Sequence, residues 1–163
     1  MNSKPIIKVF YFLMLSLLFT SCGSGEPIIT PAAGTFATDL TKAASPDYGL
    51  LFIIEPNVKN KISGYMVMCG QGGGLSMPTQ EGLTGVDVDI KDNQFTIDNQ
   101  EVLIQGKFTD ATTLAGTIQA KSGNCNIPQN AQWTATCGAP TGLSYLTIHG
   151  RSFSKEVLTG SCK

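Results

Sequence analysis

The chain has few charged side chains, a single histidine and a single tryptophan, and these shortages limit its chemistry. Charged residues make up 14% of the 163 positions, with 11 basic and 12 acidic side chains. A chain so nearly neutral lacks the basic surface through which proteins attract nucleic acid. It also lacks a C-x-x-C pair, which zinc ribbons and thioredoxin-type redox sites need. The sequence therefore predicts no nucleic-acid partner, no metal and no cofactor.

Helical periodicity is almost absent too, and apolar residues alternate with polar ones at a period of two instead. In GVDVDI, Val86, Val88 and Ile90 are expected on one face of a strand, with Asp87 and Asp89 on the other. The segments expected to form strands are 34–40, 48–55, 61–69, 85–90, 94–98, 102–108, 114–118, 131–137 and 143–150. Their spacing is typical of an antiparallel β-sandwich or a closed β-barrel of about eight to nine strands.

Residues 34–163 are accordingly expected to form a single all-β domain. The segment LLFII at 50–54 is apolar at every position, which predicts a central strand covered on both faces. Tight turns are expected at Asp92-Asn93 and at Asp98-Asn99. A short helix has room only within 38–45 or 154–158.

The first residues contain the one long apolar run of the chain. Lys4 and Lys8 precede an apolar and hydroxyl stretch from Val9 to Phe19, which is too short for a permanent membrane span. This order predicts a signal peptide over 1–21 that is removed in front of Cys22. Without the two lysines, 9 basic side chains remain against 12 acidic ones.

The tetrad FTSC, from Phe19 to Cys22, resembles the lipobox of bacterial lipoproteins, although that family prefers Leu at the place of Phe19. The resemblance implies that the Cys22 thiol receives a diacylglycerol and that the new amino terminus is acylated. Two or three acyl chains hold a protein stably at a membrane surface. We therefore expect a protein anchored by lipid in the cell envelope, outside the cytoplasm, at the outer membrane or cell surface if the cell has two membranes. An ordinary secreted protein cleaved near Ser21 and an uncleaved anchor are the alternatives.

The segment 22–33 is then expected to hold the lipidated cysteine and a flexible tether. Its sequence, CGSGEPIITPAA, mixes Gly, Ser and Pro without a helical period. The folded domain is expected to begin at Gly34.

From Tyr48 onward the order of features is also distinctive. The features are an apolar strand (50–54), a Gly-Tyr strand ending in Cys (64–69), a Gly-rich loop (70–74), IKDNQF (90–95), IQGKFTDATTLAGTI (104–118) and GNCNIPQNAQWTAT (123–136). This order resembles a recurrent domain of the bacterial envelope whose function is uncharacterised. The resemblance implies an all-β secreted fold and no reaction.

The chain has five cysteines, and lipidation of Cys22 leaves an even number for disulfides in an oxidising compartment. An extended strand over 131–137 covers about 20 Å, whereas the residues between Cys125 and Ala131 span about 17 Å at most. A Cys125–Cys137 bridge is therefore strained. This leaves two connectivities open. The envelope-domain resemblance favours Cys69–Cys125, and Cys137–Cys162 would then tie down the C-terminal extension.

Two sets of residues are candidates for ligand contact. Trp133 and Tyr65 would form an exposed platform on which sugars stack, or else Trp133 packs in the core beside a disulfide. Asp87 and Asp89 would form a weak calcium site or a pair of catalytic carboxylates, or else a solvated strand face. His149, the one histidine, lies in no nucleophile motif, so a plain polar role is expected. The loop 69–78 is expected to be a long mobile connection.

These observations favour a binding or structural module over an enzyme, because no reactive constellation is present. The expected partner is a protein or a glycan. An inhibitor of a lysozyme or protease is the alternative, with loop 69–78 or 124–130 plugging the cleft of the hydrolase. A carbohydrate-binding or hydrolytic protein is a weaker alternative.

Intact protein extracted from membranes is expected to carry a lipid-sized mass increment on Cys22. Mass spectrometry of the intact chain and of its N-terminal peptide measures it. An unmodified Cys22 would refute the anchor, together with the parity argument for two disulfides.

Overall fold

The structure is a computed structural model that describes residues 26–38, 48–71, 74–78, 81–123, 125–139, 141–159 and 162–163. The expected signal peptide and Cys22 lie outside the described residues, as does most of the segment 38–45. Within the described ranges, no helix has the length and apolar character needed to cross a membrane.

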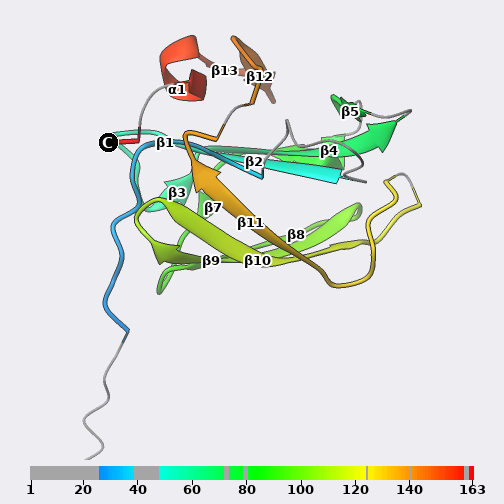
Figure 1. Ribbon diagram of the computed structural model, residues 1–163, viewed down its shortest axis with the longest axis horizontal. Helices are drawn as coiled ribbons and strands as arrows, with labels where there is room; N and C mark the ends of the chain where they lie inside the picture. The colour runs from blue at the N-terminus through cyan, green and yellow to red at the C-terminus, as the bar shows by residue number, and fades with distance from the viewer. Residues whose placement is uncertain are drawn as a thin grey trace, which may run out of the picture.

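Short strands dominate the described chain (Figure 1). They are β1 (Gly34–Ala37), β2 (Tyr48–Ile54), β3 (Lys61–Ile62), β4 (Gly64–Gln71), β5 (Gly74–Ser76), β6 (Thr84–Gly85), β7 (Val88–Asp89), β8 (Gln94–Asp98), β9 (Val102–Asp110), β10 (Thr113–Ala120), β11 (Ala131–Cys137), β12 (Leu146–Ile148) and β13 (Arg151–Phe153). A 3-10 turn, η1 (Glu81–Leu83), and one helix, α1 (Lys155–Thr159), complete the described elements.

The main sheet is antiparallel throughout and runs in the order β5-β4-β2-β1-β11-β10-β9-β8, with β6 also paired to β4. The sheet curls, so that β8, β9 and β10 lie opposite β2 and β4, and β11 crosses from one half to the other (Figure 1). The prediction of an antiparallel all-β domain is confirmed. Closure is by side-chain packing between the two halves, and the hydrogen-bonded path ends at β5 and β8.

Aromatic rings fill the space between the two halves of the sheet. Phe52 of β2 lies 5.2 Å from Trp133 of β11 and 5.3 Å from Phe95 of β8, measured between ring centroids. Phe36 of β1 meets Phe108 of β9 edge to face at 5.6 Å. Such offset and edge-on pairs stabilise a core beyond the burial of their surface.

β2 is covered on both faces, as its uninterrupted apolar sequence predicts. Leu50, Phe52 and Ile54 point into the inner core, while Leu51 and Ile53 point outward into a second core. The second core is closed by Leu146, Ile148, Phe153 and Leu158 from β12, β13 and α1. Figure 1 shows this hairpin and helix on the side of β2 away from β8–β10. We call β12, β13 and α1 the cap.

The single strand expected over 143–150 is wrong. His149 and Gly150 have φ angles of 47° and 76°, and together they turn the chain back so that β12 pairs with β13. Two consecutive left-handed residues are the signature of a type I′ hairpin turn. Of the two segments with room for a helix, 154–158 forms one, because α1 covers Lys155–Thr159.

The continuous strand expected in GVDVDI is also wrong. Asp87 has a φ of 57°, which interrupts the strand between β6 and β7. Val86 consequently packs against the second core, whereas Val88 and Ile90 pack against the inner core. β7 pairs with β3 in a separate small sheet, and β6 pairs with β4.

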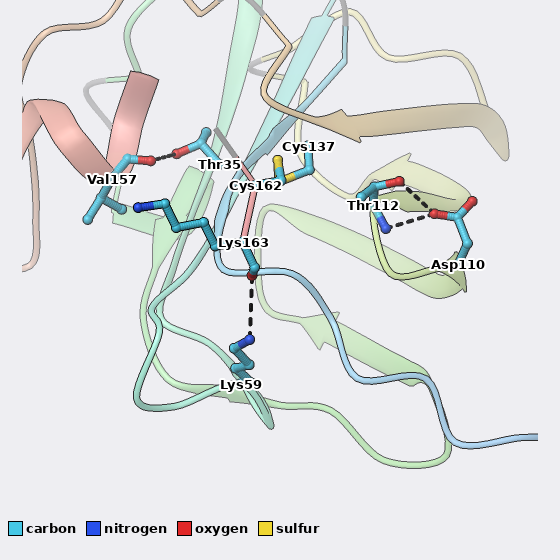
Figure 2. The surroundings of a disulfide bond; sticks show 8 residues. All are labelled: Thr35, Lys59, Asp110, Thr112, Cys137, Val157, Cys162 and Lys163. Carbon is cyan, nitrogen blue, oxygen red and sulfur yellow. Dashed lines mark hydrogen bonds between the residues drawn. A yellow bond between two sulfur atoms is a disulfide. The ribbon is translucent and has the colours of Figure 1, made fainter. Parts of the chain in front are cut away.

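Both favoured disulfides are confirmed. Cys69 of β4 is bonded to Cys125 with 5.3 Å between the Cα atoms, and Cys137 of β11 is bonded to Cys162 with 5.9 Å. Figure 2 shows the second bond beside Thr35 of β1, whose hydroxyl donates to the Val157 carbonyl of α1 at 2.8 Å. This bond and this disulfide fasten the cap to β1 and β11.

The long mobile connection expected over 69–78 is instead mostly a hairpin. β4 continues to Gln71 and β5 returns antiparallel to it, with Cys69 opposite Ser76 and Gln71 opposite Gly74. The Ser76 hydroxyl donates to the Cys69 carbonyl at 3.2 Å. The hairpin therefore extends the edge of the sheet.

The packed chain begins before Gly34, at residues expected to belong to the tether. Asn93 is 4% exposed, and its side-chain amide donates to the Pro27 carbonyl at 2.9 Å and accepts from the Ile29 amide at 2.7 Å. The Ala32 amide donates to the Ala111 carbonyl at 2.8 Å. Asn93 holds this position in the expected Asp92-Asn93 turn, where both residues have positive φ.

Replacing Gly116 by alanine is expected to lower the free energy of unfolding by about 2–3 kcal/mol. The added methyl group has no room, so the backbone of the neighbouring strand must move to admit it. A Cβ at Gly116 would lie 1.9 Å from the Gln105 carbonyl oxygen and 2.8 Å from the Trp133 ring. Denaturant unfolding with the matched Gly123→Ala variant measures the effect, since a Cβ at Gly123 meets nothing within 4 Å. Equal midpoints for the two variants would contradict this packing.

Candidate functional site

An open depression of about 690 Å³ lies where three separate chain segments meet. The segments are η1 with β6, the turn between β8 and β9, and the turn between β12 and β13. The lining residues are Glu81, Gly82, Thr84, Gly85, Val86, Asn99, Gln100, Glu101 and His149. Six of the nine lining residues have polar side chains, yet most of the accessible lining surface is apolar, so the depression offers hydrogen-bonding groups together with apolar surface.

Asn99 fixes the floor of the depression. Its side-chain oxygen, Oδ1, accepts from the backbone amides of Glu101 and Val102 at 2.9 and 3.0 Å. Its amide nitrogen donates to the Tyr65 hydroxyl at 3.1 Å and to the Gly82 carbonyl at 2.8 Å. All four hydrogen-bonding positions of the side chain are thus occupied, which holds η1 against the β8–β9 turn.

Tyr65 lies behind this floor and is only 5% exposed. Gly85 leaves the room for its ring, because a Cβ there would lie 2.3 Å from a ring carbon. Burial raises the pKa of the Tyr65 phenol above its ordinary value, and the hydrogen bond from Asn99 opposes this in part. The prediction that Tyr65 contacts a ligand on the surface is wrong, since the ring supports the depression from inside.

His149 stands exposed on the opposite side of the depression. Its Nε2 lies 3.1 Å from the Thr84 carbonyl oxygen and 3.3 Å from the Thr84 hydroxyl oxygen. A carbonyl only accepts, so Nε2 carries a hydrogen and donates it. In that state Nε2 is not a base for the Thr84 hydroxyl, which donates instead to the Glu81 carbonyl at 3.4 Å.

The remaining expected contact residues lie elsewhere. Trp133 is 5% exposed and packs against Phe52 and Phe95, so the expected packing in the core is confirmed and the alternative, an exposed stacking platform, is wrong. Asp87 pairs with Arg151 at 3.1 Å, and Asp89 pairs with Lys61 at 3.6 Å. The two carboxylates therefore engage different cations, consistent with the break in the strand at Asp87.

The described part of the chain contains no group of three or more His, Cys, Asp or Glu side chains placed to hold a metal ion. Comparisons of the chain with models of known protein families, with curated proteins and with solved structures returned no match.

The depression itself was not predicted. Its parts come from residues 81–86, 99–101 and 149, and the sequence marks them only as turns. Asn99 was expected as a turn residue, but nothing in the sequence indicates that its amide reaches Tyr65 and Gly82. His149 was expected to have a plain polar role, and its position at a left-handed turn is what brings it beside Thr84.

Replacing Tyr65 by phenylalanine is expected to make the loss of stability at alkaline pH less steep. The pKa of Tyr65 is raised above 10.0 in the folded protein, so the folded state holds this proton more tightly than the unfolded state does. The contribution of this proton to the free energy of unfolding is complete below the pKa of the unfolded state. It is lost as the pH rises through the pKa of the folded state. Denaturant unfolding across this range measures the slope.

Tyr145 provides a control of opposite sign. Hydrogen bonds with Ser152 and Thr147 lower the pKa of its exposed phenol, so Tyr145→Phe should make the alkaline loss slightly steeper. Parallel curves for Tyr65→Phe and the unchanged protein would contradict the proposed effect of burial.

Proposed function

We propose that this protein is a lipid-anchored module of the bacterial cell envelope that binds a protein or glycan partner without chemical conversion. The lipobox-like FTSC and the signal-type sequence before it support the anchor and an address outside the cytoplasm. The two disulfides support the same address, because such bonds persist in oxidising compartments. The order of features from Tyr48 onward, which resembles a recurrent envelope domain, agrees with both.

The depression around His149 is the binding site of this proposal. Its carrying observation is the pairing of Nε2 with the Thr84 carbonyl, which occupies the Nε2 hydrogen and orients the imidazole ring. Glu101 is likewise oriented, by a hydrogen bond from the Ser122 hydroxyl. Side chains held in this way, above a floor fixed by Asn99, suit recognition of hydroxyl or amide groups and cost little entropy on binding.

The inhibitor alternative receives less support. An inhibitor needs a stiff segment that projects into the cleft of a hydrolase, and the two segments expected for this lie close to the fold. The 69–78 segment continues the sheet as β4 and β5. In the other segment, Cys125 and Ile127 are buried in the inner core.

The test is retention of envelope proteins and of an array of glycans by the soluble chain, Gly23 to Lys163. The unchanged protein is expected to retain a defined ligand, and the His149→Asn, Glu81→Ala double variant to lose at least about tenfold in affinity. Asparagine is chosen because it tolerates the positive φ of His149.

Glu156→Ala is the matched control, since Glu156 is an exposed carboxylate on α1, outside the depression. Equal affinity of the double variant and the control would remove the depression from the proposal. Absence of any retained ligand would refute the binding function.

A further inference from the structure

The segment from Glu26 to Ala33 is fastened along one end of the curled sheet. The Glu26 carboxylate lies 2.5 Å from Lys107 Nζ, and Asn93 holds Pro27 and Ile29 by their backbones. The Ala32 amide donates a hydrogen bond to the carbonyl of Ala111, in the turn between β9 and β10. The chain therefore leaves the domain from a fixed place, next to the β7–β8 turn.

Only three residues, Gly23 to Gly25, separate Cys22 from Glu26. A chain of this length spans at most about 14 Å when fully extended, whatever its conformation. Lipid on Cys22, on which this inference rests, would hold Glu26 within that distance of the anchored cysteine. One end of the domain is thereby kept near the membrane.

The surface at this end has the chemistry of a membrane interface. Ile28 is 85% exposed although both of its neighbours are fastened to Asn93, so its exposure follows from the way the segment is held. Ile28 helps to line a shallow hollow of about 230 Å³, and Ile90, Lys59 and Asp92 also line it. Lys91 follows Ile90 in the sequence and forms a β-bridge with Gln94, and Gln94 is opposite Lys107. An exposed apolar side chain flanked by lysines suits the boundary between acyl chains and phosphate headgroups.

We infer that this end of the domain, which we call the anchor end (residues 26–31, 59–60, 90–93 and Lys107), rests on the lipid bilayer. Ile28 enters the interface, and Lys59, Lys91 and Lys107 face the headgroups. The candidate site then points away from the membrane. Gln94 of β8 is opposite Lys107 and Asp98 is opposite Leu103, and about 14 Å separates Gln94 from Asp98 along β8. Asn99 and the anchor end therefore lie at opposite ends of the β8–β9 hairpin.

The experiment uses the mature lipidated protein in vesicles of phosphatidylethanolamine and phosphatidylglycerol, with amine acetylation read by mass spectrometry. Lys107 and Lys121 are a matched pair, because their side chains are 40% and 35% exposed and each pairs with one carboxylate. Lys107 belongs to the anchor end, while Lys121 pairs with Asp98 at the other end of the hairpin. Acetylation of Lys107 relative to Lys121 should fall at least about threefold in vesicles compared with the soluble chain.

Two variants test the part played by Ile28. Ile28→Asn should bring the Lys107 rate back toward its soluble value, whereas Met77→Asn, which changes an exposed apolar side chain outside the anchor end, should leave the protection intact. Protection in the Ile28→Asn variant equal to that of the unchanged protein would overturn the insertion of Ile28.

The outcomes separate the two proposals. Vesicle-bound protein with the lipid increment on Cys22 but with equal rates for the two lysines, or with Lys121 protected instead, overturns the anchor end and leaves the anchor standing. Protein that lacks the increment and stays in the supernatant overturns both.

Discussion

The apolar side chains on both faces of β2 impose the requirement that the rest of the fold meets. β2 has Leu50, Phe52 and Ile54 on one face and Leu51 and Ile53 on the other. Either face, if left in water, would forgo the stabilisation that burial of apolar surface gives. Curling of the sheet brings β8, β9 and β11 over one face. The second face needs separate elements, and the cap provides them. The Cys137–Cys162 bond and the Thr35–Val157 hydrogen bond secure this cover.

Much of the architecture could be predicted because strand alternation is a local property. The strands from 94 to 137, the turn at Asp92-Asn93 and the covered strand at 50–54 all follow from residues adjacent in sequence. The failures occur where one backbone angle overrides the alternation. Asp87 and His149 adopt positive φ, which residues other than glycine do at an energetic cost, and the pattern of side chains does not reveal it.

The candidate site was less predictable than the fold, because it depends on contacts between distant segments. The sequence favours core packing for Trp133, but it does not show that the curled sheet encloses Tyr65 as well. The depression arises because Asn99 joins η1 to the β8–β9 turn, and because the cap brings His149 to β6. The attachment of residues 26–33 to the domain depends on a distant contact too. The sequence of residues 26–33 resembles a tether, and the amide of Asn93, more than sixty residues away, is what fastens it.

The pairing of the cysteines has a consequence for the order of folding. The disulfides join Cys69 to Cys125 and Cys137 to Cys162, so each bond links two neighbours in the order of these four cysteines. A chain exported amino terminus first, as the proposed address requires, presents Cys69 and Cys125 to the oxidising compartment before Cys137 arrives. Oxidation in order of arrival then yields the native bonds directly. At that address, the native pairing needs no exchange between cysteines that are already bonded.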